Sequence, residues 1–488
     1  MTPESTSPRR PVDERILLAV VLVVFAVLQL AQVSSSLELG NGTYYLRDAI
    51  AFADGDVARS RYSPGLPVLL VPVLWLTGSD PAASTVVIEI LMVAVAVAAL
   101  VLTHRVVRRH ASRWIALGVV TAFALGQAGL GFLRGINAEP VSLALVAGVV
   151  LLEGGGRRGL AAALLTGVAV AVRIALAPFF GILWLLRLRR RPQAASLALV
   201  LVMLAAGAHF ATGPVADPSY VEIAESIYDG EGGGSGGPVV TIARQVGEGI
   251  VTFGRYGVPR LVWPFRILAT PIGLVLAIGT LAAMAWGLRR RSGGLRFPVV
   301  AGATVYLGLL LLWPIRVTEA VRLVVPVAPV LLAGLAGTLD RVVSVDDEAG
   351  SSRLRQLVYG LVAVMAVVGL AAGLSGFVQT RAPSAVESDF FQAHRMAAAR
   401  TLEGPVVSRK PAVTELMLGV PAIGYPAGDP TVDDLERYAA AWSACVFVVD
   451  GLGQGDENLF AWVDANAGDI LAAVGATRIV VVDAPWCR

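Results

Sequence analysis

Residues 41–72 read NGTYYLRDAIAFADGDVARSRYSPGLPVLLVP and follow directly after the first long apolar segment of the chain. The first half of this stretch has apolar residues at helical spacing, with Tyr45, Ala49 and Ile50 on one side. That spacing, together with the charged residues elsewhere, predicts a helix lying along a membrane surface. We expect this stretch to form one wall of a site at the boundary between membrane and water.

The composition predicts an integral membrane protein. Of the 488 residues, 56% are hydrophobic and only 15% are charged. Soluble domains carry about 25% charged residues. The apolar residues fall in blocks of about 15–25, which predicts an α-helical polytopic membrane protein with about 11 transmembrane helices. The net charge of +3 comes with no pattern of basic and aromatic residues, which argues against nucleic acid as a partner.

Arginines between the apolar blocks predict the orientation of the chain. Cytoplasmic loops of membrane proteins carry an excess of Lys and Arg. Residues 1–15 are therefore expected to be a cytoplasmic tail, and residues 16–379 a multi-span domain in the cell membrane. The arginine-rich segments expected on the cytoplasmic side are residues 104–113, 157–158, 187–191 and 289–291, and the large outer loops are residues 36–82 and 213–262.

Residues 114–132 are expected to form one span, but two other apolar segments do not fit a simple span. Residues 65–77 are too short to cross a bilayer, since a spanning helix needs about 20 residues. They are expected to form a re-entrant or surface helix. Residues 159–187 are long enough, but one helix would place arginine-rich ends on opposite sides. We therefore expect two short helices that are broken near Arg173.

The composition changes after residue 379, where residues 380–488 are expected to form a soluble α/β domain with a mostly parallel sheet. The odd number of spans places this domain outside the cytoplasm. Cys445 and Cys487 both lie in it, and either a disulfide or two buried thiols fits the sequence. Strands are predicted at residues 405–408, 445–449 and 479–482, and helices at residues 432–442 and 458–474.

Polar residues gather at the predicted outer ends of the spans. Taken singly, each charge is as readily a residue that anchors a helix at the interface. Taken together, carboxylates and arginines on one membrane face suit a phosphate-bearing lipid and a hydroxyl acceptor. The three groups are the first loop with Glu38 and Asp48, the helix end with Arg134, Asn137 and Glu139, and Arg173 with Arg316, Glu319 and Arg322.

Other motifs carry no predicted chemistry. The glycine run at residues 232–237 lacks the Lys-Ser/Thr ending of a phosphate-binding loop and is interpreted as a linker. The four histidines have no metal-ligand spacing, so no metal site is assigned. No cofactor is assigned either, and the need for a divalent metal stays open.

Five short stretches form one further pattern. They are residues 44–55 (YYLRDAIAFADG), 61–72 (RYSPGLPVLLVP), 138–141 (AEPV), 167–173 (GVAVAVR) and 322–329 (RLVVPVAP). Together they resemble the GT-C superfamily of integral membrane glycosyltransferases, in particular the bacterial protein mannosyltransferase and aminoarabinose transferase group. This resemblance implies transfer of a sugar from a polyprenyl-phosphate donor to an acceptor on the outer face, with inversion at the anomeric carbon. The acceptor would be a glycan, a lipid or a protein.

The resemblance also implies roles for single residues. An acid of the first loop acts as general base in the family, and arginines hold the lipid phosphate. The family has Asp shortly before the first-loop tyrosine, where this chain has Asn41 before Tyr45. The candidates for the catalytic acid are therefore Glu38, Asp48 and Glu139, those for phosphate binding are Arg134, Arg173 and Arg322, and the first-loop motif is Asn41, Tyr45, Arg61, Tyr62, Pro64 and Gly65.

Two alternatives remain at this stage. A membrane transporter or lipid flippase would use the same charges to line a path, and it predicts polar residues through several span centres. A non-catalytic relative of the GT-C enzymes is favoured by Asn41, because an amide cannot accept the proton of an acceptor.

Overall fold

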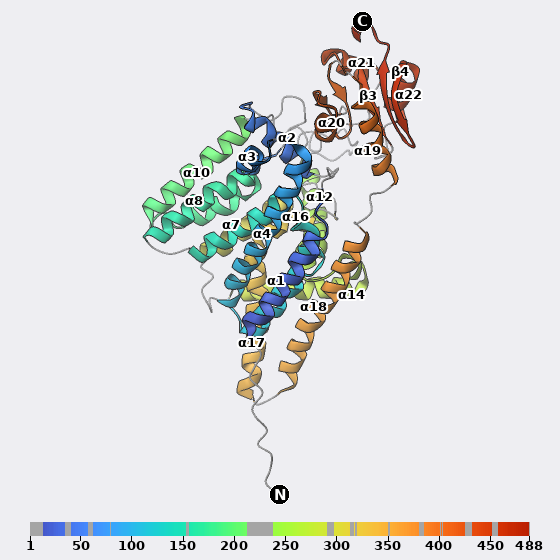
Figure 1. Cartoon of the computed structure of the whole chain (residues 1–488). Helices are drawn as coiled ribbons and strands as arrows, with labels where there is room; N and C mark the ends of the chain where they lie inside the picture. Colours follow the sequence, from blue (N-terminus) through green and yellow to red (C-terminus); the bar gives the residue numbers. More distant parts are fainter. Residues whose placement is uncertain are drawn as a thin grey trace.

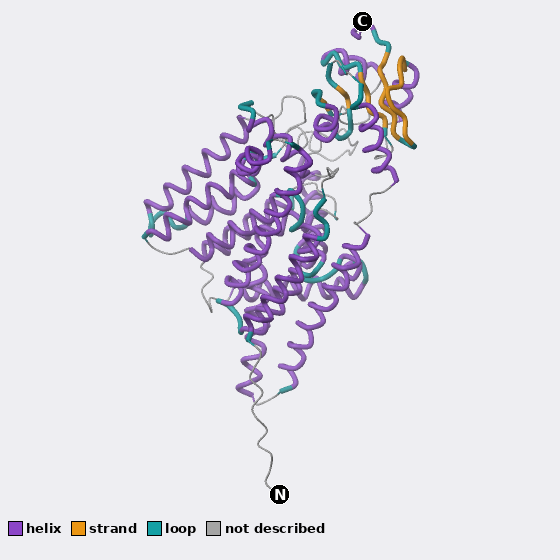
Figure 2. The backbone as a smooth tube through the Cα atoms, in the orientation of Figure 1, coloured by secondary structure: helices purple, strands orange, loops and turns teal. Residues whose placement is uncertain are grey.

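The computed structural model describes most of the chain, with its helices gathered in one bundle and a smaller α/β part at one end (Figure 1). The strands occur in that smaller part (Figure 2). The glycine run at residues 232–237 lies outside the described residues. The described residues are 13–34, 41–56, 62–78, 80–152, 156–211, 238–289, 297–312, 317, 320–349, 352–379, 385–400, 402, 404–424, 432–450 and 457–487.

The bundle is built from helices of very different length. Its elements are α1 (Glu14–Leu30), α2 (Asn41–Ala53), α3 (Gly65–Thr77), α4 (Pro81–Arg108), α5 (Arg113–Ala124), α6 (Gln127–Phe132), α7 (Ala138–Leu152), α8 (Arg157–Val172), η1 (Ile174–Leu176), α9 (Ala177–Leu185), α10 (Pro192–Ala211), α12 (Pro238–Val251), η2 (Thr252–Gly257), η3 (Pro259–Leu261), α13 (Phe265–Leu268), α14 (Pro271–Arg289), α15 (Phe297–Leu310), α16 (Ala320–Val324), η4 (Val325–Val327), α17 (Ala328–Ala349) and α18 (Arg353–Gln379).

Five helical segments among the described residues are long and apolar enough to cross a membrane. They are Pro81–Arg108, Pro192–His209, Pro271–Arg289, Ala320–Val345 and Arg353–Val378. Further apolar helices of 10–17 residues accompany them, so the predicted total of about 11 spans is not confirmed. The segment Ala320–Val345 is 83% buried and is therefore the central helix, whereas Arg353–Val378 is only 28% buried and presents apolar side chains outward.

The predicted short helix and the predicted helix break are both confirmed. A further break was not predicted. Residues 65–77 form the short helix α3, and α8 ends at Arg173, which is extended with φ −149° and ψ 97°. Residues 114–132 were predicted as one span, and this is wrong because α5 and α6 are separated at Gly126. Helix α18 approaches this break so closely that a side chain at Gly373 would overlap the carbonyl oxygen of Leu125.

The segment after residue 339 is polar. Helix α17 continues through it to Ala349. Within this segment the Ser344 hydroxyl donates a hydrogen bond to the carbonyl oxygen of Asp340, one turn earlier. At the same end, Asp340 accepts a hydrogen bond from the backbone N–H of Ser112 at the start of α5. Polar residues therefore extend this helix beyond its apolar part.

Helices α14 and α17 are in backbone contact at two glycines. A side chain at Gly287 would overlap the carbonyl oxygen of Gly334, far inside van der Waals contact. Such close approach requires small residues, as in many helix pairs within membranes.

Gly287→Val is therefore expected to destabilise the folded chain by about 1–3 kcal/mol or to prevent folding. The matched control is Gly279→Val on the same helix, since nothing lies within 4 Å of a side chain added at Gly279. Thermal unfolding in detergent and size-exclusion chromatography measure the difference. Equal stability of the two variants would contradict the predicted close contact.

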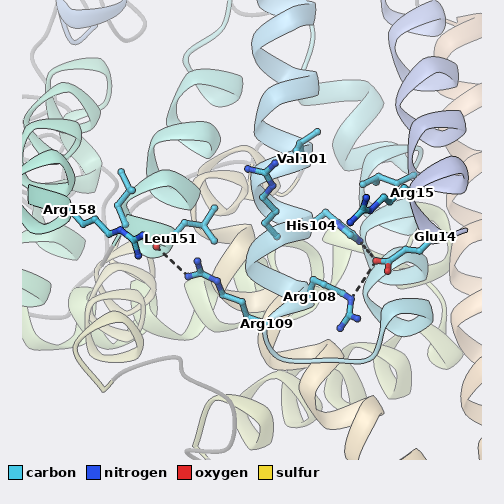
Figure 3. Close-up of a pocket in the computed structure, with 11 residues that line it drawn as sticks. Glu14, Arg15, Val101, His104, Arg108, Arg109, Leu151 and Arg158 are labelled. Atoms are coloured by element: carbon cyan, nitrogen blue, oxygen red, sulfur yellow. Dashed lines mark hydrogen bonds and ion pairs between the residues drawn. The ribbon is translucent and has the colours of Figure 1, made fainter. Parts of the chain in front are cut away.

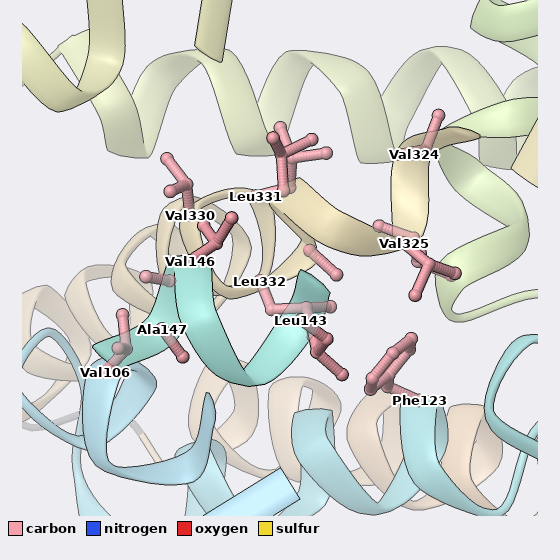
Figure 4. Close-up of a cluster of buried hydrophobic side chains, with 14 of the residues drawn as sticks. Val106, Phe123, Leu143, Val146, Ala147, Val324, Val325, Val330, Leu331 and Leu332 are labelled. Atoms are coloured by element: carbon pink, nitrogen blue, oxygen red, sulfur yellow. The ribbon is translucent and has the colours of Figure 1, made fainter. Parts of the chain in front are cut away.

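The buried core joins α4, α5, α7 and α17. Figure 4 shows Val146 and Ala147 of α7 close to Val330 of α17 and Val106 of α4. Phe123 of α5 lies at the edge of the same cluster, facing Val325. These side chains are at most 1% exposed. Their burial holds α7 against the segment from α16 to α17.

The C-terminal part contains a five-stranded sheet in the order β2-β1-β3-β5-β4. Strand β1 pairs in parallel with β2 and β3, whereas β5 is antiparallel to β3 and β4. The prediction of a mostly parallel sheet is therefore wrong, because the sheet is mixed. The elements are α19 (Ala385–Ala397), β1 (Val406–Val407), α20 (Pro411–Leu418), β2 (Ala422–Ile423), α21 (Val432–Ala441), β3 (Val446–Val449), α22 (Glu457–Ala465), β4 (Ala467–Val474), β5 (Thr477–Val482) and η5 (Pro485–Cys487).

The three predicted strands correspond to β1, β3 and β5, and the predicted helix at residues 432–442 corresponds to α21. The helix predicted over residues 458–474 is only half right, since α22 ends at Ala465 and β4 begins at Ala467. The reason is the turn at Gly475, whose φ of +51° allows β4 to fold back against β5.

Cys445 and Cys487 form a disulfide with a Cα–Cα distance of 5.6 Å. Of the two alternatives left by the sequence, the structure therefore has the bridge. It fastens the end of the chain to the residue just before β3.

His394 is a buried histidine at the centre of the C-terminal part. One of its ring nitrogens, Nδ1, lies 2.8 Å from the carbonyl oxygen of Phe390, and Nε2 lies 2.9 Å from the hydroxyl of Thr414. Burial lowers the pKa of His394 to about 4, while the hydrogen bond to Phe390 opposes this shift.

Because the folded-state pKa of His394 lies below the ordinary value of about 6.5, its contribution to stability is fully present above pH 6.5. We expect about 3 kcal/mol to be lost as the pH falls from 6.5 to 4. Thermal unfolding of the wild type and of His394→Gln between pH 4 and pH 7.5 measures this loss. The variant should lose less stability across that window, and parallel pH profiles would contradict the prediction.

Candidate active site

Glu139 is a buried carboxylate that binds two arginines from other helices. Arg173 Nη1 lies 2.9 Å from Glu139 Oε1, and Arg322 Nε donates to the same oxygen. The arginine side chains are 12% and 19% exposed, while that of Glu139 is 1% exposed. Two guanidinium groups and one carboxylate give this group a net charge of +1. Because the three side chains are largely buried, the group suits an anion.

The first-loop motif lies directly against Arg173. The Ser63 hydroxyl accepts a hydrogen bond from the backbone N–H of Ile174 at 2.9 Å, next to the helix break. Gly65 begins α3 against the backbone of Ala171, where any side chain would overlap. This close approach explains the glycine that follows Pro64, and it ties the re-entrant helix to the arginine.

Arg322 is positioned by its neighbours on both sides. The Tyr306 hydroxyl of α15 donates to the carbonyl oxygen of Leu323 at 2.6 Å and so fixes the short helix α16. On the other side, Arg322 Nη2 lies 3.5 Å from Asn137 Oδ1. Asn137 is itself held by the carbonyl oxygen of Arg134 at 2.8 Å. Arg322 is therefore held where α7 and α16 begin.

Tyrosines of the first loop cover this charged group. The Tyr62 ring lies 5.8 Å from the Tyr44 ring and 5.1 Å from the Tyr45 ring, measured between centroids. Burial raises the pKa of Tyr45, and the charge of Glu139 raises it further. Tyr45 is therefore a neutral phenol close to the carboxylate, so α2 contributes to the same site as α7, α8 and α16.

The arrangement of helices resembles that of two solved membrane enzymes. The crystal structure of ArnT from Cupriavidus metallidurans bound to undecaprenyl phosphate has a TM-score of 0.55 and 14% identity over 97% of this chain and 98% of that chain. The archaeal oligosaccharyltransferase AglB from Archaeoglobus fulgidus, in complex with an inhibitory peptide and a dolichol-phosphate, has a TM-score of 0.54 and 12% identity over 89% of this chain and 69% of that chain.

The fold is that of the GT-C glycosyltransferases. The resemblance that the sequence motifs predicted is thus confirmed at the level of the fold. No protein-family model and no curated protein sequence matches the chain. The function of the chain therefore has to follow from its own residues.

Asp48 lies near the C-terminal part of the chain. It is 1% exposed and lies 3.0 Å from Arg47, which also lies 3.6 Å from Glu415 of α20. Burial raises the pKa of Glu415, as does Asp48, while Arg47 lowers it. Leu416 packs against the apolar cluster that includes Tyr45. Helix α2 therefore contacts both the charged group at Glu139 and the C-terminal part.

The remaining predicted residues are less well connected to Glu139. The Arg134 side chain bonds Gln32 Oε1 at 2.8 Å, so it links the end of α1 to the segment before α7. Only the backbone of Asn41 is described, as the first residue of α2. The predicted residues that lie outside the described part are Glu38, Arg61, Arg316 and Glu319.

Sequence reasoning missed three residues near this end of the GT-C bundle. Glu89 is 6% exposed inside α4 and accepts a hydrogen bond from the backbone N–H of Ser34 at 3.1 Å. The sequence does signal Glu89, because this carboxylate stands alone in an apolar run and charges inside spans are rare. Tyr306 and Glu415 had no such signal, because their roles depend on contacts between distant segments.

The described residues contain no group of three or more His, Cys, Asp or Glu side chains that could hold a metal ion.

Proposed function

We propose that this chain is a membrane glycosyltransferase that transfers a sugar from a polyprenyl-phosphate donor to an acceptor on the extracytoplasmic face. The group formed by Glu139, Arg173 and Arg322 is the observation that carries the proposal. Its surplus positive charge suits a lipid phosphate, and bidentate recognition of phosphate is typical of arginine. The two similar structures, with undecaprenyl phosphate and dolichol-phosphate in their complexes, support a donor of this kind.

The reaction would be a direct displacement at the anomeric carbon. The acceptor oxygen forms a bond to that carbon and gives its proton to a carboxylate, while the bond between carbon and phosphate oxygen breaks. The leaving polyprenyl phosphate keeps the bonding electron pair. Arg173 and Arg322 would stabilise the negative charge that develops on the phosphate, which is the usual role of fixed positive groups at a leaving group.

Glu139 suits the positioning of the two arginines better than the role of base. Its Oε1 accepts from two guanidinium groups, whereas Asp48 Oδ1 accepts from one, that of Arg47. Asp48 lies one turn after Tyr45 on α2 and faces the same side of that helix. We therefore propose Asp48 or Glu38 as the base, with the acceptor approaching along α2.

The charge distribution and the disulfide support one orientation of the chain. Arginine-rich segments favour the cytoplasmic side. A disulfide between Cys445 and Cys487 suits an oxidising compartment, as found outside the cytoplasm. We propose residues 1–15 as a cytoplasmic tail, 16–379 as the membrane domain and 380–488 as an extracytoplasmic domain. Thiol labelling of intact cells before and after a membrane-impermeant reductant tests this, and cysteines labelled only after lysis would contradict it.

The activity is tested in cells that lack the gene and carry either the wild type or the double variant Arg173→Gln/Arg322→Gln. Mass spectrometry of envelope glycans and lipid-linked sugars is the measurement. The double variant should lack one glycosyl residue on an envelope acceptor and accumulate the polyprenyl-phosphate sugar. Identical glycans and lipids in both strains would overturn the proposal. Movement of a substrate across sealed vesicles without any glycosylated product would instead indicate a transporter.

A further inference from the structure

A second charged pocket lies at the opposite end of the bundle from Glu139. Glu139 is in the first turn of α7, and Leu151, which lines this pocket, is in the last turn of the same helix. From residue 139 to residue 151 the helix axis rises about 18 Å. The cavity has a volume of about 900 Å³, and it is lined by the start of α1, the end of α4, the end of α7 and the start of α8 (Figure 3).

The pocket has a strong surplus of positive charge. Its lining has a single acid among the described residues, Glu14, which lies 3.1 Å from His104 and 3.5 Å from Arg108. The other charged side chains are arginines, and Figure 3 shows Arg109 and Arg158 on one side of the opening and Arg15 and Arg108 near Glu14 on the other. The five arginines that line the cavity are Arg15, Arg105, Arg108, Arg109 and Arg158.

Apolar side chains also line this pocket. They are Leu18 of α1, Val101 of α4, and Leu151 and Leu152 of α7. The cavity therefore offers apolar surface next to its arginines.

We propose that this pocket binds the phosphate headgroup of an anionic membrane phospholipid, with the acyl chains beginning against the apolar side chains of the lining. The arginines match a phosphate diester, and basic pockets between transmembrane helices on the cytoplasmic side are known to bind such headgroups. A soluble anion would use the arginines but not these apolar side chains. The proposal does not depend on the sugar-transfer reaction.

The test uses the purified full chain and native mass spectrometry, with phosphatidylglycerol and phosphatidylcholine as competing lipids. The variant is Arg105→Gln/Arg158→Gln, which removes two positive charges from the lining. The control is Arg244→Gln/Arg353→Gln, which removes two exposed arginines elsewhere. We expect the wild type and the control to retain phosphatidylglycerol in preference to phosphatidylcholine. The pocket variant should bind phosphatidylglycerol about 30-fold more weakly. Thermal unfolding checks that it is folded.

Four results would overturn the proposal. The first is equal retention of the two lipids by the wild type. The second is unchanged retention of phosphatidylglycerol by the folded pocket variant. The third is complete displacement of the lipid by inorganic phosphate, which would identify a site for a soluble anion. Retention of undecaprenyl phosphate alone would also overturn it, since the pocket would then belong to the donor.

Discussion

Arg322→Gln is expected to slow sugar transfer by about 100- to 1,000-fold, because one of two positive groups at the leaving phosphate is lost. Glutamine keeps hydrogen-bonding capacity but has no charge to stabilise the developing phosphate dianion. The effect should appear mainly in kcat, since the charge is needed most when the bond to phosphate breaks. The measurement is transfer from a polyprenyl-phosphate sugar in proteoliposomes containing each variant.

The matched control for this experiment is Arg244→Gln. Arg244 is also an arginine bonded to a glutamate, but its side chain is 76% exposed on α12. Its replacement should leave the rate within twofold of the wild type. A rate for Arg322→Gln close to that of the control would remove Arg322 from the leaving-group site and would count against the proposed mechanism.

Glu139→Gln is expected to destabilise the folded chain by about 3–5 kcal/mol, since it leaves two buried guanidinium groups without their shared counter-charge. Adding Arg173→Gln restores the original net charge of the group. The double variant should therefore be more stable than Glu139→Gln alone, although each substitution removes a native contact. Thermal unfolding in detergent measures both variants, and the comparison is a double-mutant cycle.

An exposed pair provides the control for Glu139. Glu248 is 55% exposed and bonds Arg244 four residues earlier. Glu248→Gln should change stability by less than about 1 kcal/mol, as is usual for surface ion pairs. If the double variant at Glu139 and Arg173 were less stable than Glu139→Gln, uncompensated positive charge would not be the cause of the destabilisation.

The candidate site could be predicted in large part because its residues lie at helix ends. The break at Arg173 followed from the positions of arginines around an apolar segment, and Glu139 and Arg322 followed from charges next to spans. Each of these signals is local, so one stretch of sequence carries it. Together they were enough to bring Glu139, Arg173 and Arg322 to one expected membrane face, and the structure joins them in one ion-pair group.

The features that could not be predicted depend on contacts between distant segments. The break at Gly126 occurs where α18 lies against α5 and α6, although more than 200 residues separate them in sequence. Strand β4 contains residues compatible with a helix, and its pairing with β5 decides its conformation. The contact between Arg47 and Glu415 joins the first loop to the C-terminal part, and neither residue alone signals it.

That last contact limits how far the polypeptide can be shortened. A chain ending after residue 379 would lack Glu415 and Leu416, so Arg47 would lose one of its two carboxylate neighbours. The apolar cluster around Tyr45 would also become exposed on the side where Leu416 packs. The helical bundle is therefore expected to lose stability when the tail is removed, because the tail supports α2, the helix whose Tyr45 lies close to Glu139.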